Sequence, residues 1–112
     1  MMTKAAPSAP DAARLRSVTK RLRLTDTQME RIATALAEPR RFRILRAVAA
    51  HDNPPICGAI AEAEGVSPAT ISHHLKELQT AELIEIVREG KFGRVSLRRD
   101  IWDAYLAQLA AI

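Results

Sequence analysis

The sequence has little of what marks secreted, membrane and catalytic proteins. Its single cysteine, Cys57, cannot form an intrachain disulfide, which excludes a disulfide framework. No apolar run approaches 18 residues and the N-terminus has no apolar signal core, so we expect a cytoplasmic protein with no membrane partner. We find no Ser/His/Asp set, no phosphate-cradling glycine loop and no paired carboxylates. The sequence therefore predicts no catalytic residue, no cofactor and no enzyme.

Aromatic residues are also scarce, and this limits the hydrophobic core. Only 4% of the 112 residues are aromatic, although 47% are hydrophobic, and much of that share is alanine. The length is typical of one domain. Alanine-rich helices pack closely but each buries little area, so a second copy of the chain would supply the missing burial. The composition thus favours a homodimer.

Positive charge is concentrated at the N-terminus. The net charge is +4, and residues 1–23 hold six basic residues and one acidic residue, which leaves 11 basic and 12 acidic residues in the remainder. We expect residues 1–24 to form a basic, flexible arm and residues 25–112 to form the folded domain. Residues 1–11 are rich in Pro, Ala and Ser, whereas 12–24 could form a short amphipathic helix. The arm is either a solubilising tail or a DNA-touching segment.

Residues 60–78 are predicted to form a helix, a tight turn and a second helix. Gly65 stands where the first helix, beginning near Ile56 or Cys57, must stop and the chain must turn, and glycine tolerates the positive φ found there. Ser67 is a good N-cap and Pro68 suits the first position of a helix over 68–80. Apolar residues at i, i+4 and i+7 of that helix predict one buried stripe, made of Ile71, Leu75 and Leu78.

The opposite side of this second helix is small and polar near its N-terminus. Such a surface can approach base edges in the major groove without collision. The predicted DNA contacts are Ser67, Ala69, Thr70, Ser72, His73 and Lys76. The alternative is an ordinary helical hairpin in a small domain, in which Ser-Pro serves only as a cap.

Two short strands are predicted after this helix. Residues 83–87 (LIEIV) alternate and are rich in β-branched side chains, 89–93 supply turn residues, and 94–97 (RVSL) return. Arg88, Lys91 and Arg94 cluster near the tip, where they either contact phosphates or form a solvated loop. Together the elements predict a mainly α fold with a small two-stranded β-wing, a winged helix-turn-helix that binds double-stranded DNA.

Several motifs together resemble the ArsR/SmtB family of bacterial winged-helix repressors. They are PRRFRIL (39–45), AEAEGVS (61–67), TISHHLK (70–76), GK (90–91) and GR (93–94). The resemblance covers roughly residues 25–112. It implies a homodimeric transcriptional repressor that contacts its partner through the first and last helices of the domain and leaves an inverted-repeat operator on receiving a signal.

The helices that flank the DNA-binding motif carry the predicted dimer surface. The first begins at Thr25, which forms a capping box with Gln28, and ends before Pro39; the last is expected to be capped by Asp100. A broad apolar face on the last helix either covers its own core or meets a second copy, and the resemblance favours the second copy. The predicted interface consists of Met29, Ile32, Leu36, Trp102, Tyr105, Leu106 and Leu109.

Between these elements lies a helix predicted over residues 39–50. Its pattern predicts that Phe42, either Ile44 or Leu45, and Val48 are buried. It also carries a cluster of arginines at positions 40, 41, 43 and 46, a second local source of positive charge.

The positions that hold metal ligands in metal-sensing family members give no indication of the releasing signal in this sequence. Metal-sensing members of the family carry paired cysteines just before the first helix of the DNA motif, where this chain has Ile56 and Gly58 with Cys57 between them. A second family site on the last helix needs histidine, which that helix lacks. A soft metal needs thiolates or several imidazoles, so we expect no metal site.

Three further expectations concern single residues. Cys57 is either a small buried apolar residue or a thiol-based redox sensor. Pro68 replaces a polar residue that many family members direct at DNA, and Ala69 adds no hydrogen bond, so shape and the wing should carry more of the readout. Glu64 stands where an apolar residue is usual. Beyond the repressor and the redox regulator, a winged-helix protein-interaction module that never touches DNA stays open.

Overall fold

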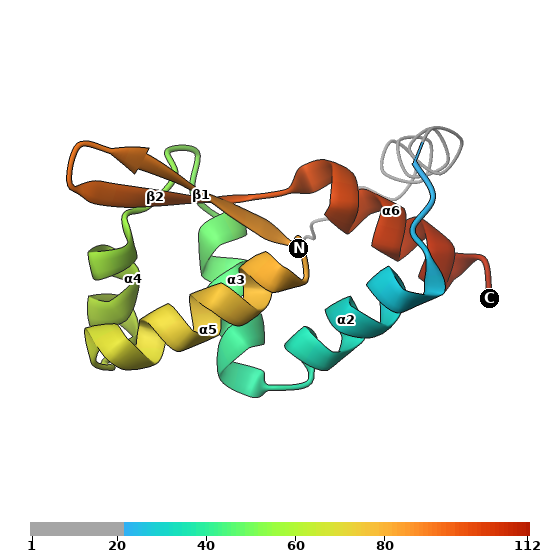
Figure 1. Cartoon of the computed structure of the whole chain (residues 1–112), viewed down its shortest axis with the longest axis horizontal. Coiled ribbons are helices and arrows are strands. Elements are labelled where there is room, and N and C mark those ends of the chain that lie inside the picture. Colours follow the sequence, from blue (N-terminus) through green and yellow to red (C-terminus); the bar gives the residue numbers. More distant parts are fainter. Residues whose placement is uncertain (1–21) are drawn as a thin grey trace, which may run out of the picture.

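Five helices and a two-stranded antiparallel sheet make up residues 22–112, the part of the chain that the computed structural model describes. In Figure 1, the hairpin and helix α4 (Cys57–Glu64) occupy one end, and helices α2 (Asp26–Leu36) and α6 (Arg99–Ala110) occupy the other. The elements are α2 (Asp26–Leu36), α3 (Pro39–Ala49), α4 (Cys57–Glu64), α5 (Pro68–Thr80), β1 (Ile84–Glu89), β2 (Phe92–Leu97) and α6 (Arg99–Ala110). This order confirms the predicted mainly α fold with a small β-wing.

Local capping explains where the first two helices begin. The Thr25 hydroxyl accepts a hydrogen bond from the Gln28 N–H at 3.1 Å, and the Gln28 side chain accepts one from the Thr25 N–H at 2.8 Å. These bonds confirm the predicted capping box. α3 begins with Pro39 after Glu38, whose carboxylate accepts from the Arg41 N–H at 3.0 Å and has a pKa lowered mainly by that bond.

One hydrophobic core joins all seven elements. Helix α5 lies at its centre and contacts α2, α3, α4 and β1. The fully buried side chains come from six elements and the turn before β1, so each of these elements is held by the others. The largest apolar ones are Ile32, Ile44, Ile71, Leu78, Leu83, Ile84 and Val95. Among residues 22–112, no helix is long and apolar enough to cross a membrane.

Two predictions about side chains on α3 and α6 were wrong. Phe42 is 39% exposed, with the Arg46 guanidinium 5.6 Å from its ring centroid, whereas Ile44 and Leu45 are both buried. Asp100 does not cap α6, because the N-cap is Arg98. Asp100 lies in the first turn and accepts two hydrogen bonds from the Arg98 guanidinium, which lowers the pKa of the carboxyl.

The folded part begins before residue 25, the predicted boundary. Leu24 is buried, and its N–H donates to the Gln108 side-chain oxygen at 2.7 Å. The Gln108 amide returns a bond to the Leu24 carbonyl at 3.1 Å, which ties this segment to α6. Residues 22–24 are not helical, so the predicted helix does not reach them; its remainder and the predicted disorder of 1–11 lie outside the described residues.

Candidate nucleic-acid interface

The turn between α4 and α5 has the geometry that its sequence predicts. Gly65 has φ 66° and ψ 35°, the left-handed conformation in which a side chain would be strained. Val66 donates its N–H back to the Ala61 carbonyl at 3.1 Å, and Ser67 accepts the Thr70 N–H at 3.1 Å. The end of α4 and the start of α5 are therefore both capped within the turn.

Helix α5 divides cleanly into a buried stripe and an exposed surface. Its buried residues are Ile71, Leu75 and Leu78, as predicted. All six residues predicted to contact DNA are exposed: Ser67, Ala69, Thr70, Ser72, His73 and Lys76. The Ser67 hydroxyl also lies 3.0 Å from that of Thr70, so the N-terminal turn presents linked hydroxyls to solvent.

The two neighbouring histidines of α5 have different surroundings. His73 is exposed, whereas His74 is half-buried and its Nδ1 is buried with no hydrogen-bond partner in the described part of the chain. Burial lowers the pKa of His74; the Glu38 carboxylate opposes this, and Arg41, His73 and Arg40 reinforce it. His74 therefore faces the N-terminus of α3, and His73 faces solvent.

The wing is a regular hairpin with a two-residue loop. Glu89 pairs with Phe92, so the loop is Gly90–Lys91 and both strands are longer than predicted. Gly90 has φ 65°, which glycine adopts readily. Gly93 belongs to β2 rather than to the turn, and a Cβ there would lie 3.0 Å from Ile86 Cγ2 and 3.3 Å from the Cys57 sulfur. This glycine lets the wing approach α4.

The three cations predicted at the wing tip do not form one cluster. Arg88 lies opposite Gly93 and Arg94 opposite Val87, so strand alternation directs the two guanidiniums to opposite faces of the hairpin. Arg88 is exposed and its Nη2 lies 3.4 Å from the Lys91 carbonyl oxygen, while the Lys91 ammonium lies 5.8 Å from the Phe92 ring centroid. Arg88 and Lys91 thus share the tip.

Arg94 is engaged within the protein itself. Its Nε donates to a Glu89 carboxylate oxygen at 2.8 Å, and its Nη1 donates to the Pro54 carbonyl at 2.8 Å. These contacts hold the guanidinium at the outer face of the wing, beside the loop that leads into α4.

Comparison with known proteins agrees with this geometry. A model of a helix-turn-helix domain matches residues 36–87. The homodimeric winged helix-turn-helix DNA-binding domain of Mb0332 from Mycobacterium bovis, a possible ArsR-family transcriptional regulator, is 30% identical with a TM-score of 0.65; the match covers 96% of this chain and 90% of that one. The chain belongs to the ArsR family of winged helix-turn-helix transcriptional regulators.

Other relatives extend the similarity. The HTH-type transcriptional regulator YceK of Bacillus subtilis (strain 168) is 29% identical over 86 residues, which are 76% of this chain and 86% of YceK. The ArsR family transcriptional regulator RHA00566 has the same fold with a TM-score of 0.69, at 20% identity, over 80% of this chain and 91% of that one.

The residues predicted to stand at the family's metal positions lie at the start of α4. Ile56 and Gly58 flank Cys57, and the described residues contain no group of three His, Cys, Asp or Glu side chains that could hold a metal ion. Cys57 is half-buried between α4 and the wing. Burial raises the pKa of its thiol, against a smaller opposing effect of the Arg88 charge, so the nucleophilic thiolate is disfavoured.

Glu64 has a role that sequence reasoning missed. Its carboxylate lies 3.6 Å from Arg43 Nε and 4.0 Å from Arg40 Nε, with 17% of the side chain exposed. The pair ties the end of α4 to α3 just before the Gly65 turn. The sequence gives no signal for this role, because both partners lie on α3, more than 20 residues earlier in the chain, and not on the same helix.

The predicted dimer surface needs a correction at two residues. Ile32 is fully buried and Tyr105 is 8% exposed, so both belong to the core of the protomer and have almost no surface to offer a partner. Leu109 is exposed, and four further members of the predicted surface are half-buried: Met29, Leu36, Trp102 and Leu106.

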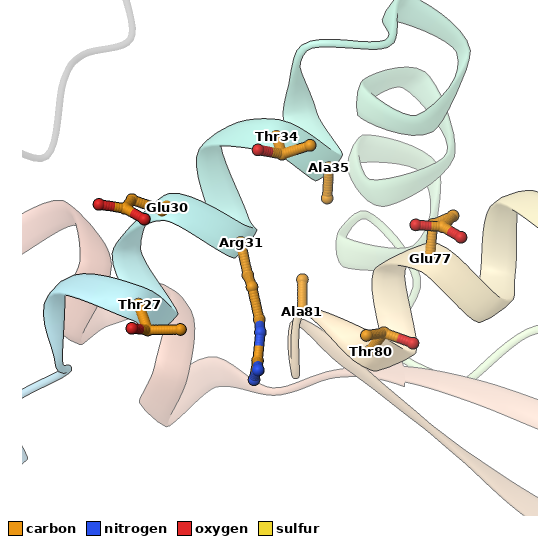
Figure 2. A pocket seen from close by; sticks show the side chains of 8 residues that line it. All are labelled: Thr27, Glu30, Arg31, Thr34, Ala35, Glu77, Thr80 and Ala81. Atoms are coloured by element: carbon orange, nitrogen blue, oxygen red, sulfur yellow. The ribbon is translucent and has the colours of Figure 1, made fainter.

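A cavity of about 290 Å³ lies between α2 and the end of α5. Figure 2 shows the Arg31 side chain running from α2 past Ala81, with Glu30 and Glu77 at the two sides. Charged and hydroxyl-bearing side chains line it together with two alanines. Among the described residues, the lining consists of Thr27, Glu30, Arg31, Thr34, Ala35, Glu77, Thr80 and Ala81.

Proposed function

We propose that this ArsR-family protein is a sequence-specific DNA-binding regulator that acts in the cytoplasm as a homodimeric repressor. The observation that carries the proposal is the exposed surface of α5. Its small and hydroxyl-bearing N-terminal residues face solvent, while its apolar stripe is fully covered. A helix with that division can enter the major groove while the domain behind it stays folded.

In this proposal the residues of α5 contact base edges, and the wing tip contacts the phosphate backbone of the DNA. Ser72, His73 and Lys76 have side chains able to reach base edges, with Ser67, Ala69 and Thr70 at the entry of the helix. Arg88 and Lys91 lie beside one another at the tip of the hairpin and supply the phosphate contacts.

We propose that α2 and α6 form the dimer interface. The M. bovis relative is a homodimeric domain, and the present chain carries exposed or half-buried apolar side chains on both helices. The proposed contacts are Met29, Leu36, Trp102, Leu106 and Leu109. Two copies related by a two-fold axis would place two α5 helices on an inverted repeat.

Mobility shifts on genomic fragments at several salt concentrations test DNA binding. We expect a fragment upstream of the protein's own gene or a neighbouring gene to bind much more tightly than unrelated DNA of the same length. All affinities should fall as salt rises, because binding to phosphates releases counterions. Equal and salt-independent binding, or none, would instead favour a protein-interaction module.

The releasing signal, in this proposal, is neither a metal at the usual positions nor Cys57. Zinc, cadmium and arsenite should leave the protein on its operator, because Ile56 and Gly58 provide no ligand. The Cys57→Ser variant should bind and regulate like the parent, because the thiol is half-buried with a raised pKa. A thiol oxidant that releases the parent but not Cys57→Ser would show that Cys57 is the sensor.

A further inference from the structure

Arg94 connects the wing to the loop before the DNA-binding motif. One N–H of its guanidinium bonds the Glu89 carboxylate in the opposite strand, and another bonds the Pro54 carbonyl, 40 residues earlier in the chain. Both distances are 2.8 Å. A guanidinium can serve two acceptors in fixed directions, which makes it suited to join two segments.

The backbone around Arg94 makes the same connection. Arg94 forms an isolated antiparallel bridge with Ile56, and the Val95 N–H donates to the Pro55 carbonyl at 2.8 Å. Ile56 is also the N-cap of α4. The edge of β2 is thus continuous with the start of the helix-turn-helix, and the Arg94 side chain reinforces this junction from the outer face of the hairpin.

The charge of Arg94 is already compensated inside the wing. Glu89 forms an ion pair with it, whereas Arg88 and Lys91 have no carboxylate partner among the interactions of the described residues. Arg94 also lies on the hairpin face opposite to Arg88. A phosphate bound to the remaining N–H groups of Arg94 would lie close to the Glu89 carboxylate, which would repel it.

We propose that Arg94 is a positioning residue: it sets the direction of the wing relative to α4 and α5 without contacting DNA. The inference rests on the proposed DNA-binding function. Arg88 and Lys91 then make the phosphate contacts of the wing. Their position over the DNA backbone depends on the Arg94–Pro54 and Arg94–Glu89 bonds.

The test compares Arg94→Ala and Arg94→Lys with the parent, with Lys91→Ala as the phosphate-contact reference and Arg99→Ala as an exposed-arginine control. Each full-length protein is assayed for affinity and salt dependence on its own upstream DNA. Amide hydrogen exchange at Val95 reports on the junction without any DNA. The thermal midpoint and exchange within α5 report on the rest of the fold.

Both Arg94 variants should weaken DNA binding roughly tenfold, because a wing that these bonds no longer hold must be ordered when it binds. They should do so with an unchanged salt slope, because no phosphate contact is lost, whereas Lys91→Ala should lower the slope by about 1. Val95 exchange should accelerate roughly tenfold or more in both variants while α5 exchange stays as in the parent. Lysine keeps the charge but cannot reproduce the two-acceptor geometry.

Three results would overturn the inference. The first is parental affinity in Arg94→Lys with a lowered salt slope in Arg94→Ala, which marks a phosphate contact. The second is unchanged Val95 exchange in both variants. The third is accelerated exchange throughout α5, which marks general destabilisation. If the parent binds no DNA at all, the proposed function fails by itself, and Val95 exchange still decides whether Arg94 holds the junction.

Discussion

Helices α5 and α6 have similar lengths but bury their residues in different ways. In α5 the buried residues form a single stripe, and nearly all residues around it are exposed and mostly polar. In α6 burial spreads over Ile101, Asp103, Ala104 and Tyr105, with Trp102 and Leu106 half-buried beside them. A helix held by one narrow stripe can offer the rest of its surface to a polar ligand. A helix with half-buried apolar side chains beside its core residues still exposes apolar surface, which an apolar partner can bury.

The most direct test of the buried stripe on α5 is to truncate one of its side chains. Leu78 is fully buried, so Leu78→Ala should lower the free energy of unfolding by about 2–5 kcal/mol, from lost burial and the cavity left behind. Denaturant unfolding measures this, with Lys76→Ala as an exposed control on the same helix that should change stability by less than about 0.5 kcal/mol. A loss below about 1 kcal/mol for Leu78→Ala would mean that α5 is held by other contacts.

On α6, truncating Trp102 should weaken dimerisation and operator binding together. We expect Trp102→Ala to weaken dimerisation by about 2 kcal/mol or more, as buried tryptophans at interfaces do, and to weaken operator binding with it. Sedimentation equilibrium and mobility shifts measure the two effects. Phe92→Ala, which removes an exposed aromatic ring from the wing, is the matched control and should leave the dimer intact. A monomeric Trp102→Ala protein with parental operator affinity would contradict the link.

The exposed face of α5 should show a difference between specific and non-specific DNA. His73→Ala should weaken operator binding by about 1–3 kcal/mol if the ring reaches a base edge, and should weaken binding to unrelated DNA less. Gln79→Ala, at the exposed C-terminal end of the same helix, should change neither. Equal losses on both DNAs for His73→Ala would assign His73 to the backbone.

The smallest expected effect concerns pH and His74. Its pKa in the folded protein is lowered by burial, so the fold favours the neutral ring and its contribution to stability is complete above the unfolded pKa of about 6.5. That contribution is lost as pH falls through the folded value. Between pH 7 and pH 5 the parent should therefore lose stability more steeply than His74→Gln, measured by denaturant unfolding. Identical slopes would show that the folded and unfolded pKa values are equal.

Local sequence signals predicted the helix-turn-helix well. Gly65, Ser67 and Pro68 act through conformation and capping within a few residues, so their effects can be read without knowing the rest of the fold. The stripe on α5 follows from helical period alone.

What the sequence could not predict depends on contacts between distant segments. Period alone left open whether Ile44 or Leu45 is buried. The structure buries both, since α2, α4, α5 and β2 all pack on α3, and it leaves Phe42 exposed. The opposed directions of Arg88 and Arg94 follow from the hairpin register. The loop forms at Gly90–Lys91, which places Gly93 in β2, where a Cβ would lie 3.3 Å from the sulfur of the distant Cys57.

Footprinting on the protein's own upstream DNA, with the mass of the complex measured in parallel, tests the central claim most directly. We expect two protected half-sites related by inverted symmetry, with centres about one helical turn, 34–36 Å, apart, and two protein chains per DNA. Protection of a single asymmetric half-site by one chain would contradict a two-fold dimer that places one α5 helix in each half-site.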